Sequence, residues 1–170
     1  MPEDVTRIMV LPGVTLHVTA RYFPVVIATW FGTPTVEAVE RYADWLATMS
    51  SRAKAEGTKV VIIGDTTASG RPGPDVRRGM ARALERLGGP NREGLMGGST
   101  IIGHPLMRAV LSIVMAITRE KIDLKPVKSL EAAFDRTREL LDEAGIPWPE
   151  GLDLQTYQRP TLPDGLEPQD

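Results

Sequence analysis

Hydrophobic and polar residues alternate strictly over residues 15–22, which is the pattern of a β-strand with one buried face. The apolar positions of this strand are Leu16, Val18, Ala20 and Tyr22. A Phe-Pro pair follows, and residues 25–31 are rich in the branched and aromatic side chains that favour strands. We therefore predict that 15–22 and 25–31 pair as an antiparallel β-hairpin.

Four segments are predicted to be helices. Thr33 is the expected N-cap of the first, with Pro34 at its first helical position, and Gly57 closes it. The second spans residues 75–87 and the third residues 105–120. The fourth is expected to begin after Ser129 and to end at Gly145.

The remaining strands alternate with these helices. Residues 60–63 are continuously apolar, as in a central strand that is covered on both faces. Shorter strands are expected at 99–102 and 124–128, and the Gly-rich segment 88–98 is expected to be a mobile connection. Such alternation implies right-handed crossovers and a mainly parallel sheet. The predicted fold class is α/β: a mixed, mainly parallel sheet with an N-terminal β-hairpin and four helices, in the order ββαβαβαβα.

Three regions are predicted along the chain. Residues 1–13 form an N-terminal segment, 14–145 the domain, and 146–170 a Pro-rich acidic tail with five acids and one base. Tail residues Trp148 and Tyr157 are expected to anchor a strap across an apolar surface, with the third helix as the leading candidate. Acids such as Asp153 and Glu167 are expected to approach arginines.

Composition narrows the function classes. The net charge of −2 gives no basic field for nucleic acid, and the absence of cysteine excludes disulfides, thiolate zinc sites and a cysteine nucleophile. The two histidines have no carboxylates at ligand spacing, so no metal and no cofactor are expected. No secretion signal is recognised, and no apolar run approaches the ~18–20 residues of a membrane span. We therefore expect a cytoplasmic protein.

Three stretches resemble one known family. "GTPTVEAVERYADWL" at 32–46, "KVVIIGD" at 59–65 and "VKSLEAAFDRTRELL" at 127–141, together with the hairpin, are similar to the STAS family. The similarity is to SpoIIAA-like or SEC14-like STAS proteins of bacteria. It implies a regulatory, scaffold-like, protein–protein interaction role rather than catalysis. In STAS proteins of the anti-sigma-factor-antagonist type, the loop after the strand at 60–63 carries a serine that a partner kinase phosphorylates.

The polar stretch after that strand is the first candidate site. Its possible regulatory residues are Asp65, Thr66, Thr67 and Ser69. Ser69 is the nearest match to the family's serine, although the spacer at 71–74 separates it from the helix, which departs from the family pattern. One alternative is a plain polar turn in which Asp65 caps backbone N–H groups. Another is an enzyme that acts through Asp65 and His104. No phosphate-binding fingerprint is present.

Two helices are candidate binding surfaces. The second helix and its approach carry a basic face, which is either solvated or binds an acidic partner: Arg71, Arg77, Arg78, Arg82 and Arg86. In the third helix, ten of the twelve residues 106–117 are apolar, so something beyond its own sheet should cover it. The expected apolar interface consists of Leu106, Met107, Val110, Leu111, Val114 and Met115.

The sequence thus predicts a non-enzymatic regulatory module that acts through protein partners and self-associates as a homo-oligomer. The alternative is a SEC14-like carrier or sensor of an apolar small molecule. In that case Met107 and Met115 of the third helix would line a cavity.

Overall fold

The computed structural model describes residues 6–89, 92–118 and 122–162. Its strands and helices follow one another along the chain in this order: β1 (Thr6–Leu11), β2 (Val14–Thr19), β3 (Val25–Gly32), α1 (Val36–Ala55), β4 (Val60–Ser69), α2 (Pro74–Gly88), β5 (Leu95–Ile101), α3 (Pro105–Ile117), β6 (Leu124–Val127) and α4 (Leu130–Glu143). A short 3₁₀ helix, Arg92–Gly94, leads into β5.

The six strands form one sheet in the order β1-β2-β3-β4-β5-β6. β1, β2 and β3 are antiparallel neighbours, whereas β3, β4, β5 and β6 run parallel to one another. Each parallel pair is joined through a helix, the usual form of the long crossover that parallel strands need. The predicted α/β class, with its mixed, mainly parallel sheet, its hairpin and its four helices, is confirmed.

The sheet has one strand more than predicted. β1 lies within residues 1–13, which were expected to precede the domain, and it pairs along its whole length with β2. The boundary expected at residue 14 is therefore wrong. The sequence feature that indicates this hairpin is the Pro12-Gly13 pair after an apolar run. Gly13 adopts the positive φ of 73° that a tight hairpin turn needs.

Hydroxyl side chains cap the N-termini of α1 and α4, but the cap of α1 is a different residue from the one predicted. The N-cap of α1 is Thr35 and not Thr33: the Thr35 side chain accepts a hydrogen bond from the backbone N–H of Ala38 at 3.2 Å. Pro34 therefore lies before the helix, because β3 continues to Gly32 and leaves a short linker. Ser129 caps α4 as expected, through Ala132 N–H at 3.1 Å.

Part of the segment expected to be a mobile connection is a buried strand. β5 includes Gly97 and Gly98, both buried. A Cβ on Gly98 would lie 1.9 Å from the carbonyl oxygen of Ile62, so only glycine allows β4 and β5 to approach this closely. The glycines that suggested flexibility are in fact a packing requirement.

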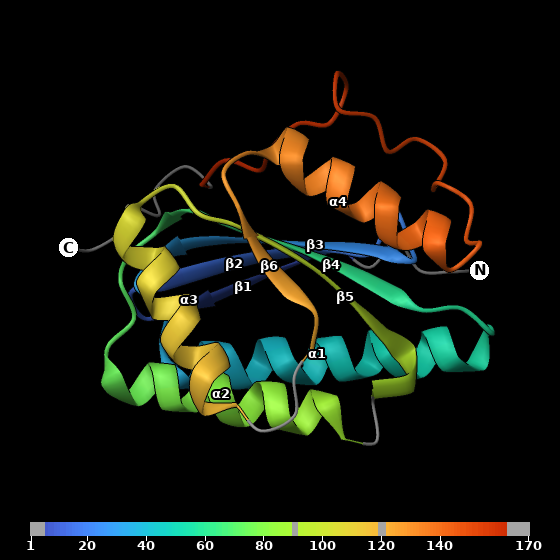
Figure 1. Cartoon of the computed structure of the whole chain (residues 1–170). Helices are drawn as coiled ribbons and strands as arrows, with labels where there is room; N and C mark the ends of the chain where they lie inside the picture. Colours follow the sequence, from blue (N-terminus) through green and yellow to red (C-terminus); the bar gives the residue numbers. More distant parts are fainter. Residues whose placement is uncertain (1–5, 90–91, 119–121, 163–170) are drawn as a thin grey trace.

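The sheet is covered on both faces (Figure 1). α1, α2 and α3 lie on one face, where the larger core includes Leu16, Trp30 and Leu46. α4 lies on the other face over a smaller core that includes Ile27 and Phe134.

The tail packs on the α4 face, so the expected location against the third helix is wrong. Figure 1 shows residues 146–162 running back over α4, on the opposite side of the sheet from α3. The Trp148 ring lies 5.9 Å from that of Phe134, and its indole N–H donates to the Leu152 carbonyl at 2.6 Å. The chain turns back directly after α4, so its anchors reach the apolar side chains of that face without crossing the sheet.

The charged contacts of the tail also differ from expectation. Asp153 accepts a hydrogen bond from Gln155 N–H at 2.7 Å within the tail itself. Glu167 lies outside the described residues. The cross-contact comes instead from the tail's arginine: Arg159 Nε lies 3.0 Å from Asp65 Oδ2.

Candidate functional site

The polar stretch that was expected to be a loop is the second half of β4. β4 stays paired with β3 until Ser69 lies opposite Gly32, with a register shift after Thr29. On its other side, Thr66 Oγ1 donates to the carbonyl of Ile101 in β5 at 2.7 Å. Polar residues are tolerated in this strand because their side chains find partners within the sheet.

Asp65 is held by its neighbours on every side. Its Oδ1 accepts hydrogen bonds from Thr67 N–H at 3.1 Å and Thr67 Oγ1 at 2.6 Å, the capping role proposed in the polar-turn alternative. Its Oδ2 pairs with Arg159, and its side chain is 5% exposed. Burial, reinforced by the nearby Asp65 carboxylate, raises the pKa of Tyr157 to about 12, against the opposing effects of a hydrogen bond with Thr29 and of the Arg159 charge.

The residues of the enzymatic alternative are each engaged elsewhere. His104 is the N-cap of α3, where its Nδ1 accepts from Leu106 N–H at 3.2 Å. Asp65 joins the tail to the sheet. In the ranges 6–89, 92–118 and 122–162, no group of three or more metal-binding side chains is close enough to hold an ion.

Ser69, the candidate phosphorylation site, lies at the end of β4 and is half-buried. Its hydroxyl donates to the carbonyl of Gly70 at 3.1 Å. A regulatory role for this serine stays a prediction.

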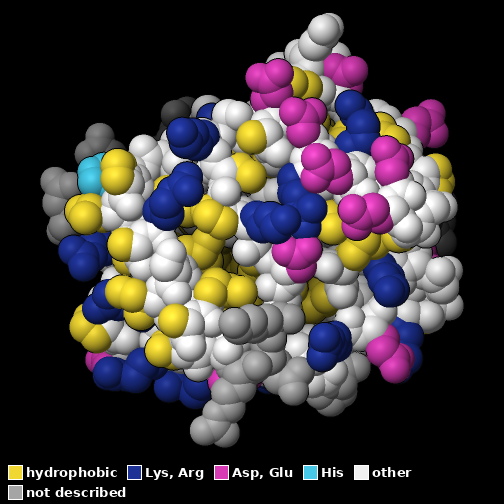
Figure 2. All heavy atoms as spheres, viewed as in Figure 1, with side chains coloured by type: hydrophobic (Ala, Val, Ile, Leu, Met, Phe, Trp, Pro, Cys, Tyr) yellow, Lys and Arg dark blue, Asp and Glu magenta, His cyan; other side chains and the backbone are white. Residues whose placement is uncertain are grey.

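The basic face of α2 is partly neutralised within the chain. Arg78 pairs with Asp75 one turn away, and Arg86 pairs with Asp44 of α1 at 2.9 Å. Arg71 and Arg82 are exposed. Figure 2 shows basic side chains along the edge of the molecule over α2, whereas acidic ones gather over α4.

α3 divides into an inner and an outer side. Of the six expected interface residues, Met107, Val110 and Val114 are buried within the chain, Leu111 and Met115 are half-buried, and Leu106 is 51% exposed. The outward apolar positions also include two that the sequence did not single out, Ile113 at 45% and Ile117 at 48%. Because α3 is apolar on almost every side, its sequence does not show which side faces outward.

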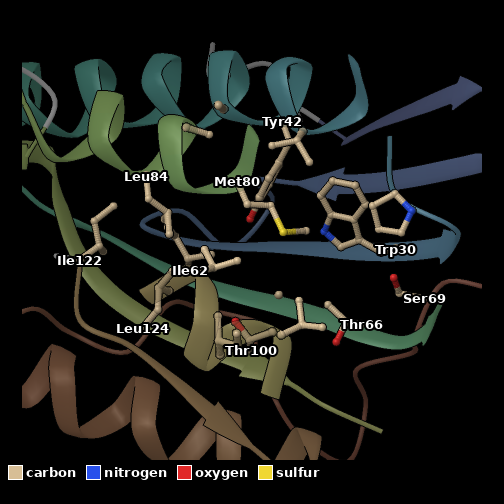
Figure 3. Close-up of a pocket in the computed structure, with 18 of the residues that line it drawn as sticks. Trp30, Tyr42, Ile62, Thr66, Ser69, Met80, Leu84, Thr100, Ile122 and Leu124 are labelled. Carbon is tan, nitrogen blue, oxygen red and sulfur yellow. The ribbon is translucent and has the colours of Figure 1, made fainter. Parts of the chain in front are cut away.

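An apolar cavity of about 150 Å³ lies beneath α3, between this helix, α1, α2 and the sheet (Figure 3). Figure 2 shows a hollow lined with hydrophobic side chains between α3 and β6. Met107 lines the cavity, whereas Met115, which the carrier alternative also placed there, is not among the lining residues. The described part of the chain has no helix that is long and apolar enough to cross a membrane.

Comparison with known proteins gives one structural likeness. No protein-family model matches the chain, and no curated protein matches it significantly. The structure is similar to the crystal structure of an anti-sigma factor antagonist from Mycobacterium paratuberculosis. The similarity covers 76% of this chain and 99% of that chain, with 15% sequence identity and a TM-score of 0.46. At this identity the likeness concerns the fold alone, and no residue role is taken from it.

Proposed function

We propose that the protein is a non-enzymatic interaction module whose α2–α3 surface binds an acidic protein partner. The observation that carries this proposal is the outer side of α3, where Leu106, Ile113 and Ile117 are each about half exposed. Large apolar side chains that gather on one helix in this way are typical of a binding surface.

The arginines beside this apolar stripe favour an acidic partner. α3 packs against α2, so the stripe has the basic face of α2 at its side. Within the described part of the chain, Arg71 and Arg82 have no ion-pair partner. An apolar stripe with a cationic border matches an amphipathic helix that carries apolar anchors and Asp or Glu at its rim.

The role of the polar residues supports a binding function rather than catalysis. Asp65 is engaged by Thr67 and Arg159, and His104 caps a helix. Neither side chain is free to act on a bound substrate in this arrangement.

The test begins with affinity capture from the source cells, after which the captured protein is identified and purified. Its affinity is then measured for two double variants, Ile113→Gln with Ile117→Gln and Arg71→Glu with Arg82→Glu. We expect each to weaken binding by about tenfold or more, in line with removal of 1.4 kcal/mol or more. A matched charge reversal on α4, Glu131→Lys with Asp135→Lys, should leave the affinity unchanged.

Equal affinity of all three variants would refute this assignment of the surface. Sedimentation with anionic phospholipid vesicles provides a second control. One outcome would replace the protein partner by a membrane surface. In this outcome the wild-type protein binds the vesicles, and no captured protein binds less well to the Ile113→Gln, Ile117→Gln variant.

Self-association is proposed separately, through the edge strand β1. Its Ile8 and Val10 are 51% and 55% exposed, and among the strands that the structure describes none pairs with its outer edge. The opposite edge, β6, is only four residues long and contains Pro126, a common protection against pairing. A second copy could therefore pair along β1. Light scattering should give a dimer for the wild type and a monomer for Val10→Lys; a monomeric wild type would contradict the proposal.

A further inference from the structure

The cavity beneath α3 is larger than the gaps that a folded core usually leaves. Protein interiors are packed about as densely as organic crystals, with few voids larger than a water molecule. An apolar cavity of about 150 Å³, such as one engineered in another protein, stays dry and accepts benzene. The cavity here has the same size and a mostly apolar lining.

The cavity has an identifiable cause in the sequence. Gly64 lies on the face of β4 that points toward the cavity, and it presents no side chain there. A Cβ at Gly64 would meet its nearest neighbours, Ser99 O and Thr100 Oγ1, at 3.9 Å, so this position has room for a side-chain atom that glycine does not supply. α3 roofs the space with Met107, Val110 and Val114 and packs mainly on α2.

The two ends of the cavity differ chemically (Figure 3). Leu84, Ile122 and Leu124 lie at one end, and Thr66 and Ser69 lie toward the other, where β4 finishes. Both hydroxyls already donate their hydrogen to backbone carbonyls. Their oxygens can still accept, so this end is suited to a ligand with an N–H or O–H donor.

We propose that this cavity is a binding site for a compact apolar molecule, from benzene to indole in size, with a single hydrogen-bond donor directed at Thr66. Every described residue that lines the cavity is uncharged, which disfavours an ionic ligand because its charge would be left unpaired. The volume is too small for a lipid with two long chains. The site is separate from the outer side of α3, so this inference goes beyond the proposed partner binding and does not depend on it.

The experiment uses the full chain with carbon-13-labelled methionine methyl groups and indole as the probe. Met80 and Met107 line the cavity, whereas Met9 and Met96 are not among its lining residues. We expect saturable shifts of the Met80 and Met107 methyl signals in NMR spectra. The signals of Met9 and Met96 should stay in place.

Variants then test the position and the polarity of the site. Gly64→Val and Ala83→Leu each fill part of the cavity, and at least one folded variant should weaken indole binding about tenfold or more. Thr66→Val removes the acceptor, so it should weaken indole binding while leaving the affinity for benzene within about twofold.

Three results would overturn the inference. The first is the absence of a saturable shift up to the solubility limit of indole. The second is equal movement of all four methionine signals, which would indicate non-specific association. The third is wild-type affinity in the folded cavity-filling variants. If Thr66→Val lost the same fraction of its affinity for indole and for benzene, the assignment of Thr66 as the polar end of the site would be overturned. Partner capture is measured separately, so its failure leaves these readouts unaffected.

Discussion

Replacing Arg159 by methionine tests whether one ion pair holds the tail to the sheet. The substitution keeps an apolar stem of similar length but removes the guanidinium that lies 3.0 Å from Asp65 Oδ2. Asp65 would then stay buried in β4 without its cationic partner, at 5% side-chain exposure. Burying a charge whose partner has been removed is costly, so we expect the folded state to be destabilised.

The magnitude follows from the two environments. An exposed ion pair contributes about 0–1 kcal/mol to stability, whereas breaking a fully buried ion pair costs about 3–5 kcal/mol. Arg159 is 42% exposed, so water screens part of this interaction. Asp65 also keeps both hydrogen bonds from Thr67. We therefore expect Arg159→Met to lower the free energy of unfolding by about 1–2 kcal/mol, which corresponds to a drop in Tm of roughly 2–8 °C for a chain of this size.

Urea unfolding, followed by tryptophan fluorescence, measures this difference. The matched control is Arg41→Met, since Arg41 forms an exposed pair with Glu37 at 2.8 Å and should contribute less than about 0.5 kcal/mol. In a double-mutant cycle with Asp65→Asn, the coupling energy should be about 1 kcal/mol. If Arg159→Met unfolds at the same urea concentration as Arg41→Met, the pair does not hold the tail.

Three further predictions concern packing and pH. Gly98→Ala should lower the free energy of unfolding by about 3 kcal/mol or more, because the new Cβ would collide with the carbonyl oxygen of Ile62. Gly64→Ala, whose Cβ would have no neighbour closer than 3.9 Å, should lower it by less than about 1 kcal/mol in the same urea assay. Since the pKa of Tyr157 is raised to about 12, the stability that its neutral form contributes is complete below the unfolded pKa of about 10 and is lost as the pH rises through 12. Ultraviolet titration of the wild type and of Tyr157→Phe measures, by difference, the pH at which Tyr157 ionises. Burial lowers the pKa of His17 despite a backbone hydrogen bond, so its contribution is present above the unfolded pKa of about 6.5 and is lost as the pH falls through the folded value. His17→Gln should therefore flatten the acid side of the Tm–pH curve, and an unchanged curve would contradict this assignment.

The order of helices and central strands could be predicted from short-range patterns. Ser129 caps α4 because the cap depends on a hydroxyl and on an N–H three residues away. The alternation in β2 and the apolar run that opens β4 likewise depend on neighbours in the sequence. These features are local, so the sequence alone predicts them.

The candidate sites were predicted less well, because their environment comes from distant segments. The stretch from Asp65 to Ser69 is polar enough to suggest a loop, but pairing with β3 keeps it extended. The glycines of β5 suggested flexibility, and the close approach of Ile62 explains them instead.

The sequence by itself determined the α/β class, the four helices and the apolar character of α3. The tertiary structure decided which face each element covers: the tail packs on the side of α4 because its anchors reach Phe134 there without crossing the sheet. It also decided that α3 roofs a cavity, since the space depends on Gly64 in the sheet and on the packing of α3 against α2. Local patterns record which residues avoid water, but they do not record which distant residues will cover them.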